Sequence, residues 1–303
     1  QLFGYSIAQV PGSLIISSPG QDSSKGAVHI IDYHVSDDGS ITFIKPVIDR
    51  LPTASLNLPV YANFGATVSA STGTINSSAT TFIAVGAPRY NEGEGAVFIY
   101  ENKNLVQQIT ISSDILSTIS LRRGDGLGSK LLFDSTGQYL FVATPYSTQG
   151  LDKKGQVLVL KRLETTSTFV LNQVLTAPYG SVISNFGLDL SVEMAGDTLV
   201  ISGVGALLET SFDQNNSNNK ETTFDSGTTK FRTIQNRSGS VYLFNRYNDK
   251  FIFAQSIIVK NIDSSSSYGN SVVATDKTIF VGAPGVSNIN TQTGKLYIFD
   301  KDS

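Results

Sequence analysis

The chain has no cysteine and no tryptophan, and only two histidines occur among its 303 residues. Without cysteine it cannot form disulfides, thiolate metal sites or a cysteine nucleophile. His29 and His34 are separated by an odd number of positions, so in one strand they project from opposite faces and could not chelate one metal without distortion. We therefore interpret both as structural, and expect neither a histidine-assisted triad nor a histidine-rich zinc site.

Charge and long apolar runs are also scarce. Charged residues make up 16% of the chain, the net charge is −3, and no basic stretch is extended. These values argue against a nucleic-acid partner. No apolar run reaches the roughly 18–20 residues that a membrane helix needs, so no transmembrane segment is expected.

Three N-x-S/T sequons lie in polar, loop-like sequence, at Asn76, Asn215 and Asn236. These glycosylation candidates favour a secreted protein or one in the lumen of the secretory pathway. The residues after Gln1 do not resemble a signal peptide. Any targeting segment is therefore expected to lie upstream, outside this sequence.

What the chain does have is one short pattern in five copies. An aromatic residue or leucine followed by glycine opens each copy, at Phe3-Gly4, Phe64-Gly65, Leu127-Gly128, Phe186-Gly187 and Tyr268-Gly269. An apolar run follows and ends in a small-residue turn such as Gly86-Ala87-Pro88, and a later glycine begins an aromatic-rich run such as Gly95-Ala96-Val97-Phe98. The repeats cover residues 3–63, 64–126, 127–185, 186–267 and 268–303, and the fourth contains an insertion over 207–237. A fixed period of this kind determines the whole architecture.

Each repeat is expected to form four short strands. In the second copy we predict strands over 65–69, 82–85, 96–100 and 105–111, with a polar turn from Ser71 to Thr80. Helical periodicity is absent, so the fold class is all-β. Four strands repeated in series are typical of a β-propeller, and we expect residues 1–303 to form one propeller domain or the C-terminal part of one.

The motif Phe-Gly, then Gly-Ala-Pro, then Gly-x-Val-Tyr-x-Phe resembles the FG-GAP repeat, and the resemblance covers essentially the whole chain. That family includes the seven-bladed integrin α-subunit heads and the C-terminal propeller of glycosylphosphatidylinositol-specific phospholipase D. It implies a secreted propeller that is part of a seven-bladed ring. The fifth copy stops after its third strand, so the chain is either a five-bladed ring with an open last blade or the C-terminal part of a longer chain. We favour the second, in which upstream sequence supplies the missing strand and further blades.

Many members of this family bind calcium in a D-x-D/N-x-D-G loop between the first two strands. The corresponding turns here contain one acidic residue or none, except the fourth, whose two acidic residues lack the required spacing. We predict no calcium site of the family type, and no cofactor in this chain.

Three other features have a structural interpretation that we favour. Arg123-Gly124-Asp125 spells a tripeptide that some integrins bind, but Gly and Asp at this place also suit a turn. The insertion has little apolar content, which favours flexible decoration. The carboxylates Asp189, Asp197 and Asp225 have no spacing that singles them out as a catalytic pair.

Two functions from different classes remain. The first is a non-catalytic accessory propeller of a secreted hydrolase resembling glycosylphosphatidylinositol-specific phospholipase D, which orients the upstream catalytic domain and its substrate. The second is an integrin-like or adhesin-like propeller that binds a protein or glycan without enzymatic activity. In both, the loops between the second and third strands are the expected partner face, with Arg89, Tyr90 and Tyr146 as candidate residues.

Overall fold

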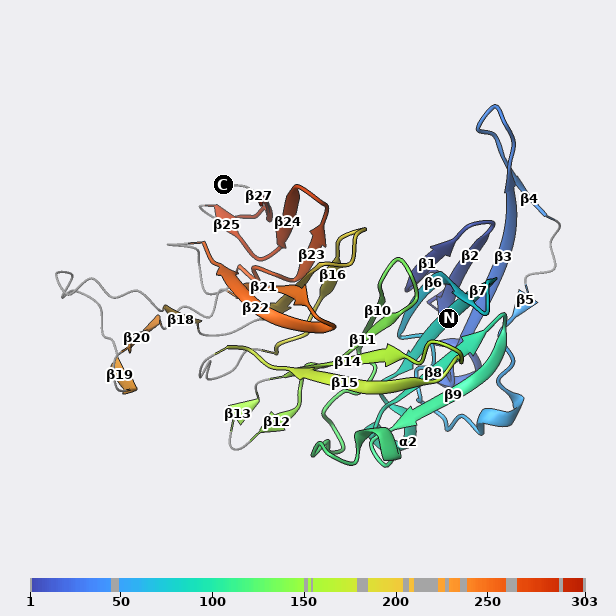
Figure 1. Cartoon of the computed structure of the whole chain (residues 1–303), viewed down its shortest axis with the longest axis horizontal. Helices are drawn as coiled ribbons and strands as arrows, with labels where there is room; N and C mark the ends of the chain where they lie inside the picture. The colour runs from blue at the N-terminus through green and yellow to red at the C-terminus, as the bar shows by residue number, and fades with distance from the viewer. Residues whose placement is uncertain are drawn as a thin grey trace. The chain divides into compact units, whose positions relative to one another are not determined.

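The computed structural model of this chain is all-β, and its sheets are the blades of a β-propeller fold, as the repeats predict (Figure 1). It describes residues 2–44, 49–149, 152–153, 155–178, 185–203, 207–209, 223–226, 229–234, 239–259, 266–288 and 291–301. There are five blades, one for each repeat. They belong to two compact units, with blades 1 to 3 in the first and blades 4 and 5 in the second.

Each blade is an antiparallel sheet whose strands follow one another in chain order. Blade 1 contains β1 (Ile7–Val10), β2 (Ser13–Ser18), β3 (Ala27–Val35) and β4 (Ile41–Phe43), and β5 (Asp49–Arg50) pairs with β3. Blade 2 contains β6 (Thr67–Ile75), β7 (Ser78–Ala87), β8 (Ala96–Glu101) and β9 (Asn104–Thr110). Blade 3 contains β10 (Lys130–Phe133), β11 (Tyr139–Thr144), β14 (Gln156–Arg162) and β15 (Phe169–Leu175).

The second unit repeats this order. Blade 4 contains β16 (Leu190–Val192), β17 (Thr198–Gly203), β21 (Ser240–Tyr247) and β22 (Lys250–Ile257). Blade 5 has three strands among the described residues, β23 (Ser271–Ala274), β24 (Thr278–Ala283) and β27 (Lys295–Asp300).

The remaining elements are short. They are the strands β12 (Thr148–Gln149), β13 (Asp152–Lys153), β18 (Leu207–Glu209), β19 (Thr223–Ser226), β20 (Thr229–Ile234), β25 (Ser287–Asn288) and β26 (Thr291–Gln292), and the helical turns α1 (Gln21–Ser24), η1 (Ala54–Leu56), α2 (Tyr90–Gly93) and η2 (Asp114–Leu116). Among the described residues, no helix has the length and apolar character that a membrane crossing requires.

One predicted turn is wrong in extent. The segment from Ser71 to Thr80 is not a long polar turn, because β6 and β7 continue and pair as far as Ile75 and Ser78. Only Asn76 and Ser77 connect them, with φ of 48° and 65°. Two left-handed residues suit a tight hairpin, and asparagine tolerates this conformation better than most residues. The polar run is therefore mainly strand.

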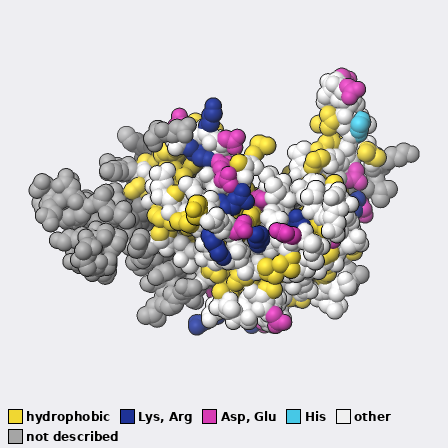
Figure 2. Space-filling view, in the orientation of Figure 1, with side chains coloured by type: hydrophobic (Ala, Val, Ile, Leu, Met, Phe, Trp, Pro, Cys, Tyr) yellow, Lys and Arg dark blue, Asp and Glu magenta, His cyan; other side chains and the backbone are white. Residues whose placement is uncertain are grey.

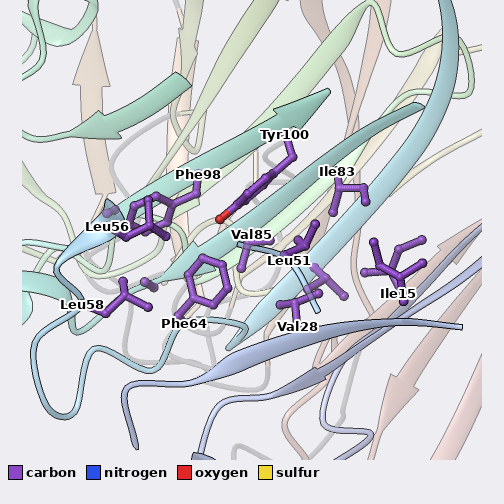
Figure 3. Packing of buried hydrophobic residues seen from close by; sticks show 14 of the residues in the cluster. Ile15, Val28, Leu51, Leu56, Leu58, Phe64, Ile83, Val85, Phe98 and Tyr100 are labelled. Atoms are coloured by element: carbon purple, nitrogen blue, oxygen red, sulfur yellow. The ribbon is translucent and has the colours of Figure 1, made fainter. Parts of the chain in front are cut away.

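Alternation along the strands gives blade 2 two apolar faces. In β8, Phe98 and Tyr100 join a cluster with Ile15 and Val28 of blade 1, whereas Val97 and Ile99 join a cluster with residues of blade 3. Figure 3 shows the first cluster, with Phe64 and Phe98 close together. We call the side of a blade that meets the preceding blade its leading face and the opposite side its trailing face. The burial of both faces explains why blade strands read as nearly continuous apolar runs.

The glycine before the third strand is needed for contact between successive blades. A Cβ on Gly26 would lie 1.9 Å from the carbonyl oxygen of Phe64, the residue that opens the next blade. The same relation recurs for Gly95 with Leu127 (2.5 Å) in the first unit and for Gly239 with Tyr268 (1.8 Å) in the second. No side chain fits at such a distance. The glycine before the third strand of one blade and the residue that opens the next blade therefore form a single close contact.

The opening side chain also packs within its own blade. Its ring contacts the residue three places after the glycine of the third strand, in the pairs Phe3–His29 (5.5 Å), Phe64–Phe98 (5.3 Å), Phe186–Tyr242 (5.4 Å) and Tyr268–Tyr297 (5.4 Å). His29 thus occupies a position where other blades have an aromatic side chain. Packing against Phe3 is therefore a structural role for His29.

Hydrogen bonds join the first strands of neighbouring blades in each unit. The Ser6 hydroxyl accepts from the Val68 amide at 3.1 Å, and the Asp189 carboxylate accepts from the Val272 amide at 2.8 Å. A second bond of this kind lies two positions later in the repeat. The Ser69 hydroxyl accepts from the Phe133 amide, and the Ser191 hydroxyl accepts from the Ala274 amide, both at 2.8 Å. The second unit therefore repeats the register of the first.

Candidate functional site

The loop between the second and third strands of blade 2 has a strained conformation. Asn91, Glu92 and Gly93 are all left-handed, with φ of 47°, 58° and 98°, and the Gly95 amide closes the turn on the Tyr90 carbonyl at 3.1 Å. The left-handed conformation costs a non-glycine residue about 1–2 kcal/mol. A turn kept at this cost presents its side chains in one fixed arrangement, which suits a recognition loop.

Blade 1 has the same turn at the same place. Residues 22–24 are left-handed there, with φ of 51°, 58° and 61°, and the Gly26 amide donates to the Gln21 carbonyl at 3.1 Å. The two loops share a final glycine but few other residues, so the repeated backbone contact specifies the turn.

Tyr90, one of the predicted partner-face residues, is mainly a packing residue. Its half-buried ring lies edge-on to Phe98, with centroids 5.7 Å apart, and its hydroxyl accepts from the Gln108 side chain at 3.3 Å. Arg89 and Tyr146, in contrast, are exposed. Tyr90 therefore supports the loop, whereas Arg89 and Tyr146 are accessible to a partner.

The segment before blade 3 attaches to this turn. The Arg123 guanidinium contacts both the Glu92 carboxylate (2.6 Å) and the Glu92 carbonyl (2.5 Å), and the Gly124 amide donates to the Gly93 carbonyl at 2.8 Å. The Tyr146 amide donates to the Asp125 carbonyl at 3.1 Å, which adds the loop of blade 3.

Three segments that are separate in the sequence therefore form one continuous surface. We call it the loop surface and define it by the exposed residues Arg89, Glu92, Arg122, Arg123 and Tyr146. Figure 2 shows charged side chains of both signs intermixed on the face of the chain that it presents. The loop surface itself combines the Glu92 carboxylate with the guanidinium groups of Arg89, Arg122 and Arg123, which favours a partner with its own pattern of charges over a uniformly charged polymer.

The Arg123-Gly124-Asp125 tripeptide is a turn, as its composition suggested. The Asp125 side chain is buried, and its carboxylate accepts from the Arg122 amide at 2.8 Å. A buried aspartate that caps its own turn cannot be presented to a receptor. Only the arginine of the tripeptide contributes to the loop surface.

The glycosylation candidates differ in what the structure describes. Asn76 is exposed at the tip of the β6–β7 hairpin, where a glycan could be attached without disturbing the sheet. Asn215 and Asn236 lie outside the described residues, as does most of the insertion over 207–237.

The structure does not bring the other candidate residues together. His29 is half-buried and lies 3.1 Å from the Gln21 side chain, whereas His34 is exposed further along β3. Asp189 receives the Val272 amide, Asp197 pairs with Arg246 at 2.7 Å, and the side chain of Asp225 is not described. Within the described residues no three acidic or histidine side chains are grouped as a metal would require. The absence of family-type calcium stays a prediction.

One hollow was not predicted from the sequence. A cavity of about 290 Å³ in blade 1 is lined by Asp22, Lys25, Arg50, Thr53 and Asn57, among others. Arg50 pairs with Asp22 across it at 2.7 Å. The hollow depends on the path of the segment that follows β5, which no sequence motif indicates.

Comparison with known proteins does not show a family for this chain. No protein-family model matches the chain, and no curated protein matches it. Similar solved structures include a Bacteroides fragilis protein provisionally described as a 6-phosphogluconolactonase, at 11% identity and a TM-score of 0.49, covering 99% of this chain and 67% of the other. A Bacteroides uniformis protein with the same provisional description has 12% identity and a TM-score of 0.45, covering 97% of this chain and 70% of the other. Likeness at this level says nothing about activity.

Proposed function

We propose that this chain is a non-catalytic accessory propeller that binds a partner domain through the loop surface. In the first candidate function, the partner is the catalytic domain of a secreted hydrolase resembling glycosylphosphatidylinositol-specific phospholipase D. The observation that carries the proposal is the interlocking of three loops by Arg123, Gly124 and Tyr146. Loops fixed on a rigid scaffold are where binding residues are most often found.

The chemistry of the loop surface suits a folded protein partner. Arginine and tyrosine are enriched in the energetically important centres of protein interfaces. Arg123 is already paired with Glu92, whereas Arg89 and Arg122 form no ion pair among the described residues. These two guanidinium groups are therefore available to carboxylates of a partner.

The hydrolase version rests on the FG-GAP-like repeats and the exposed Asn76 sequon, which favour secretion. It is tested by assaying the intact parent protein for release of lipid-anchored proteins from membranes. Replacing Arg89 and Arg122 by glutamate is expected to lower release, whereas Lys250→Glu, on the separate strand β22, serves as the control. No release by a folded, metal-loaded protein contradicts the hydrolase version.

The second candidate is an integrin-like or adhesin-like propeller that binds a protein or glycan without enzymatic activity. The same loop surface supports it, because a fixed turn with an exposed tyrosine can also contact a sugar or a peptide. The two versions differ in the sequence upstream of Gln1. A metal-binding domain rich in histidine and aspartate supports the hydrolase, and a membrane-anchored receptor layout supports the adhesin.

A further inference from the structure

The hollow in blade 1 has the size and the walls of a site for a small polar molecule. Its volume of about 290 Å³ is at the small end of ligand pockets, which run from about 300 to 1,000 Å³. All of its lining residues belong to the first compact unit. Gly26 and the buried side chain of Leu58 form its apolar part, and the other lining residues are charged or polar.

The lining of the hollow has a surplus of positive charge. Lys25 and Arg50 are its two cations, and Asp22 is the one carboxylate among the described residues that line it. The ion pair joins one guanidinium nitrogen of Arg50 to one carboxylate oxygen of Asp22 at 2.7 Å, and a guanidinium has further N–H groups to donate. Lys25 is exposed, and its side chain has no ion pair or hydrogen bond with any described residue. Positive charge is therefore available to a ligand.

The corresponding turn of blade 2 has no such cation. Asp22 and Lys25 occupy the places of Asn91 and Glu94, because both turns have the same left-handed residues and the same closing glycine. The Asn91 side chain donates to the Glu94 carboxylate at 2.7 Å, so these two positions of blade 2 satisfy each other. In blade 1, Asp22 pairs instead with Arg50 of β5. The shared turn therefore does not require an unpaired lysine at this position.

Two neutral side chains complete the lining. The Thr53 hydroxyl and the Asn57 carboxamide form no hydrogen bond with any described residue, and each can both donate and accept. They suit hydroxyl groups of a ligand for that reason. We propose that the hollow binds a small hydroxylated monocarboxylate, whose carboxylate accepts from Lys25 and Arg50. A single negative charge balances the lining, whereas a dianion would place a second negative charge near Asp22.

The test is isothermal titration calorimetry of the purified 303-residue chain with D-glucuronate as the probe. D-Glucose, which has the same ring and no carboxylate, is the neutral control. We expect glucuronate to bind with a dissociation constant in the millimolar range, because Lys25 and Arg50 are exposed to water, and we expect no binding of glucose. The hollow shares no residue with the loop surface, so this proposal is independent of the proposed function.

Two variants and a control locate the binding. Lys25→Gln removes the unpaired charge and is expected to weaken glucuronate binding about fivefold. Asp22→Asn removes the carboxylate that competes for Arg50, so it is expected to strengthen binding about twofold. Asparagine tolerates the left-handed conformation of Asp22, which has φ of 51°. Lys277→Gln makes the same change as Lys25→Gln at an exposed lysine of the second unit, and should leave binding unchanged.

The substituted positions are all exposed, so the variants are expected to fold, and thermal unfolding checks this. Absence of glucuronate binding by the folded wild-type chain overturns the proposal. So does glucose binding as tight as that of glucuronate, or binding that Lys25→Gln and Lys277→Gln weaken equally. Inorganic phosphate is the last probe, and phosphate binding tighter than that of glucuronate would overturn the assignment to a monocarboxylate.

Discussion

Gly26 and Phe64 come from successive blades, and they approach so closely that a Cβ on Gly26 would lie 1.9 Å from the Phe64 carbonyl oxygen. Their backbones also form a parallel bridge. The glycine at the start of a third strand and the aromatic residue that opens the next repeat are therefore two parts of one structural unit.

Replacing this glycine tests that relationship. We expect Gly26→Ala to lower the free energy of unfolding by at least about 2 kcal/mol, because the methyl group meets backbone that cannot move without separating the blades. Gly39→Ala is the matched control, since Gly39 has a similar φ of 82° with nothing within 4 Å. It should lose only about 1 kcal/mol from the backbone conformation. Equal losses of the free energy of unfolding for the two variants, measured by urea denaturation, would show that the contact between Gly26 and Phe64 does not contribute to stability.

The hydroxyl group of Tyr268 is a buried polar group without a hydrogen-bond partner among the described residues. Burial raises the pKa of Tyr268, as expected for a phenol in apolar surroundings. Because phenylalanine opens three of the five copies, we expect Tyr268→Phe to raise the free energy of unfolding by about 1 kcal/mol.

Tyr100→Phe is the matched comparison for Tyr268. The Tyr100 hydroxyl donates to the Pro52 carbonyl at 3.1 Å, so its removal should cost about 1 kcal/mol. Thermal unfolding of the two variants side by side gives opposite signs if this explanation holds. Destabilisation by Tyr268→Phe would mean that its hydroxyl is bonded in solution.

His29 should make stability depend on pH. Burial and, secondarily, the positive charge of Arg50 lower the pKa of His29 below its usual value of 6.5. The unfolded chain then binds a proton at His29 more readily than the folded chain does. The free energy of unfolding is therefore unaffected by His29 above pH 6.5, and it decreases as the pH falls from 6.5 toward the folded-state pKa.

His29→Gln removes the titrating group, so we expect a flatter stability profile between pH 7 and pH 5, measured by urea denaturation in matched buffers. His34→Gln is the control because His34 is exposed on the same strand, and it should leave the wild-type slope unchanged. A slope that persists in His29→Gln would assign the pH dependence to another group.

Arg162 joins the first strand of blade 2 to blade 3. Its buried guanidinium donates to the carbonyl groups of Thr74 (3.2 Å), Gly137 (3.1 Å) and Thr166 (3.4 Å), and it lies 5.0 Å from the centre of the Phe82 ring. Lysine cannot reproduce this planar set of donors, so Arg162→Lys should cost about 2–3 kcal/mol.

Arg122→Lys, at an exposed position, is the control for Arg162 and should cost less than about 0.5 kcal/mol. Chemical denaturation of both variants measures the two losses in the free energy of unfolding. If Arg162→Lys were as mild as the control, the three carbonyl groups would have to be satisfied by other donors.

The spacing of the repeats was enough to predict the blades. Glycines such as Gly26 and Gly95 mark the start of a third strand, and a residue such as Phe64 marks the start of a repeat, so the ends of these elements can be read from local sequence. The extent of β6 and β7 was not predictable, since polar residues such as Thr72 and Thr74 read as a turn until pairing partners are known. Tertiary contacts decide such cases over local propensity.

The candidate site was predicted less well. Its place between the second and third strands followed from the repeat, but the role of each residue did not. Tyr90 and Tyr146 look alike in sequence, and only the packing of Tyr90 on Phe98 separates a supporting residue from an exposed one. The link from Arg123 to Glu92 joins residues 31 positions apart and has no sequence signal.

The close approach of Gly26 and Phe64 has a consequence for how such chains change over evolutionary time. A duplication that copies one whole repeat also copies one opening residue and one receiving glycine, so the new blade can dock without compensating mutations. A substitution at the receiving glycine, in contrast, is tolerated only if the following blade changes its entry path. Blade number should therefore vary more readily among descendants than the receiving glycine.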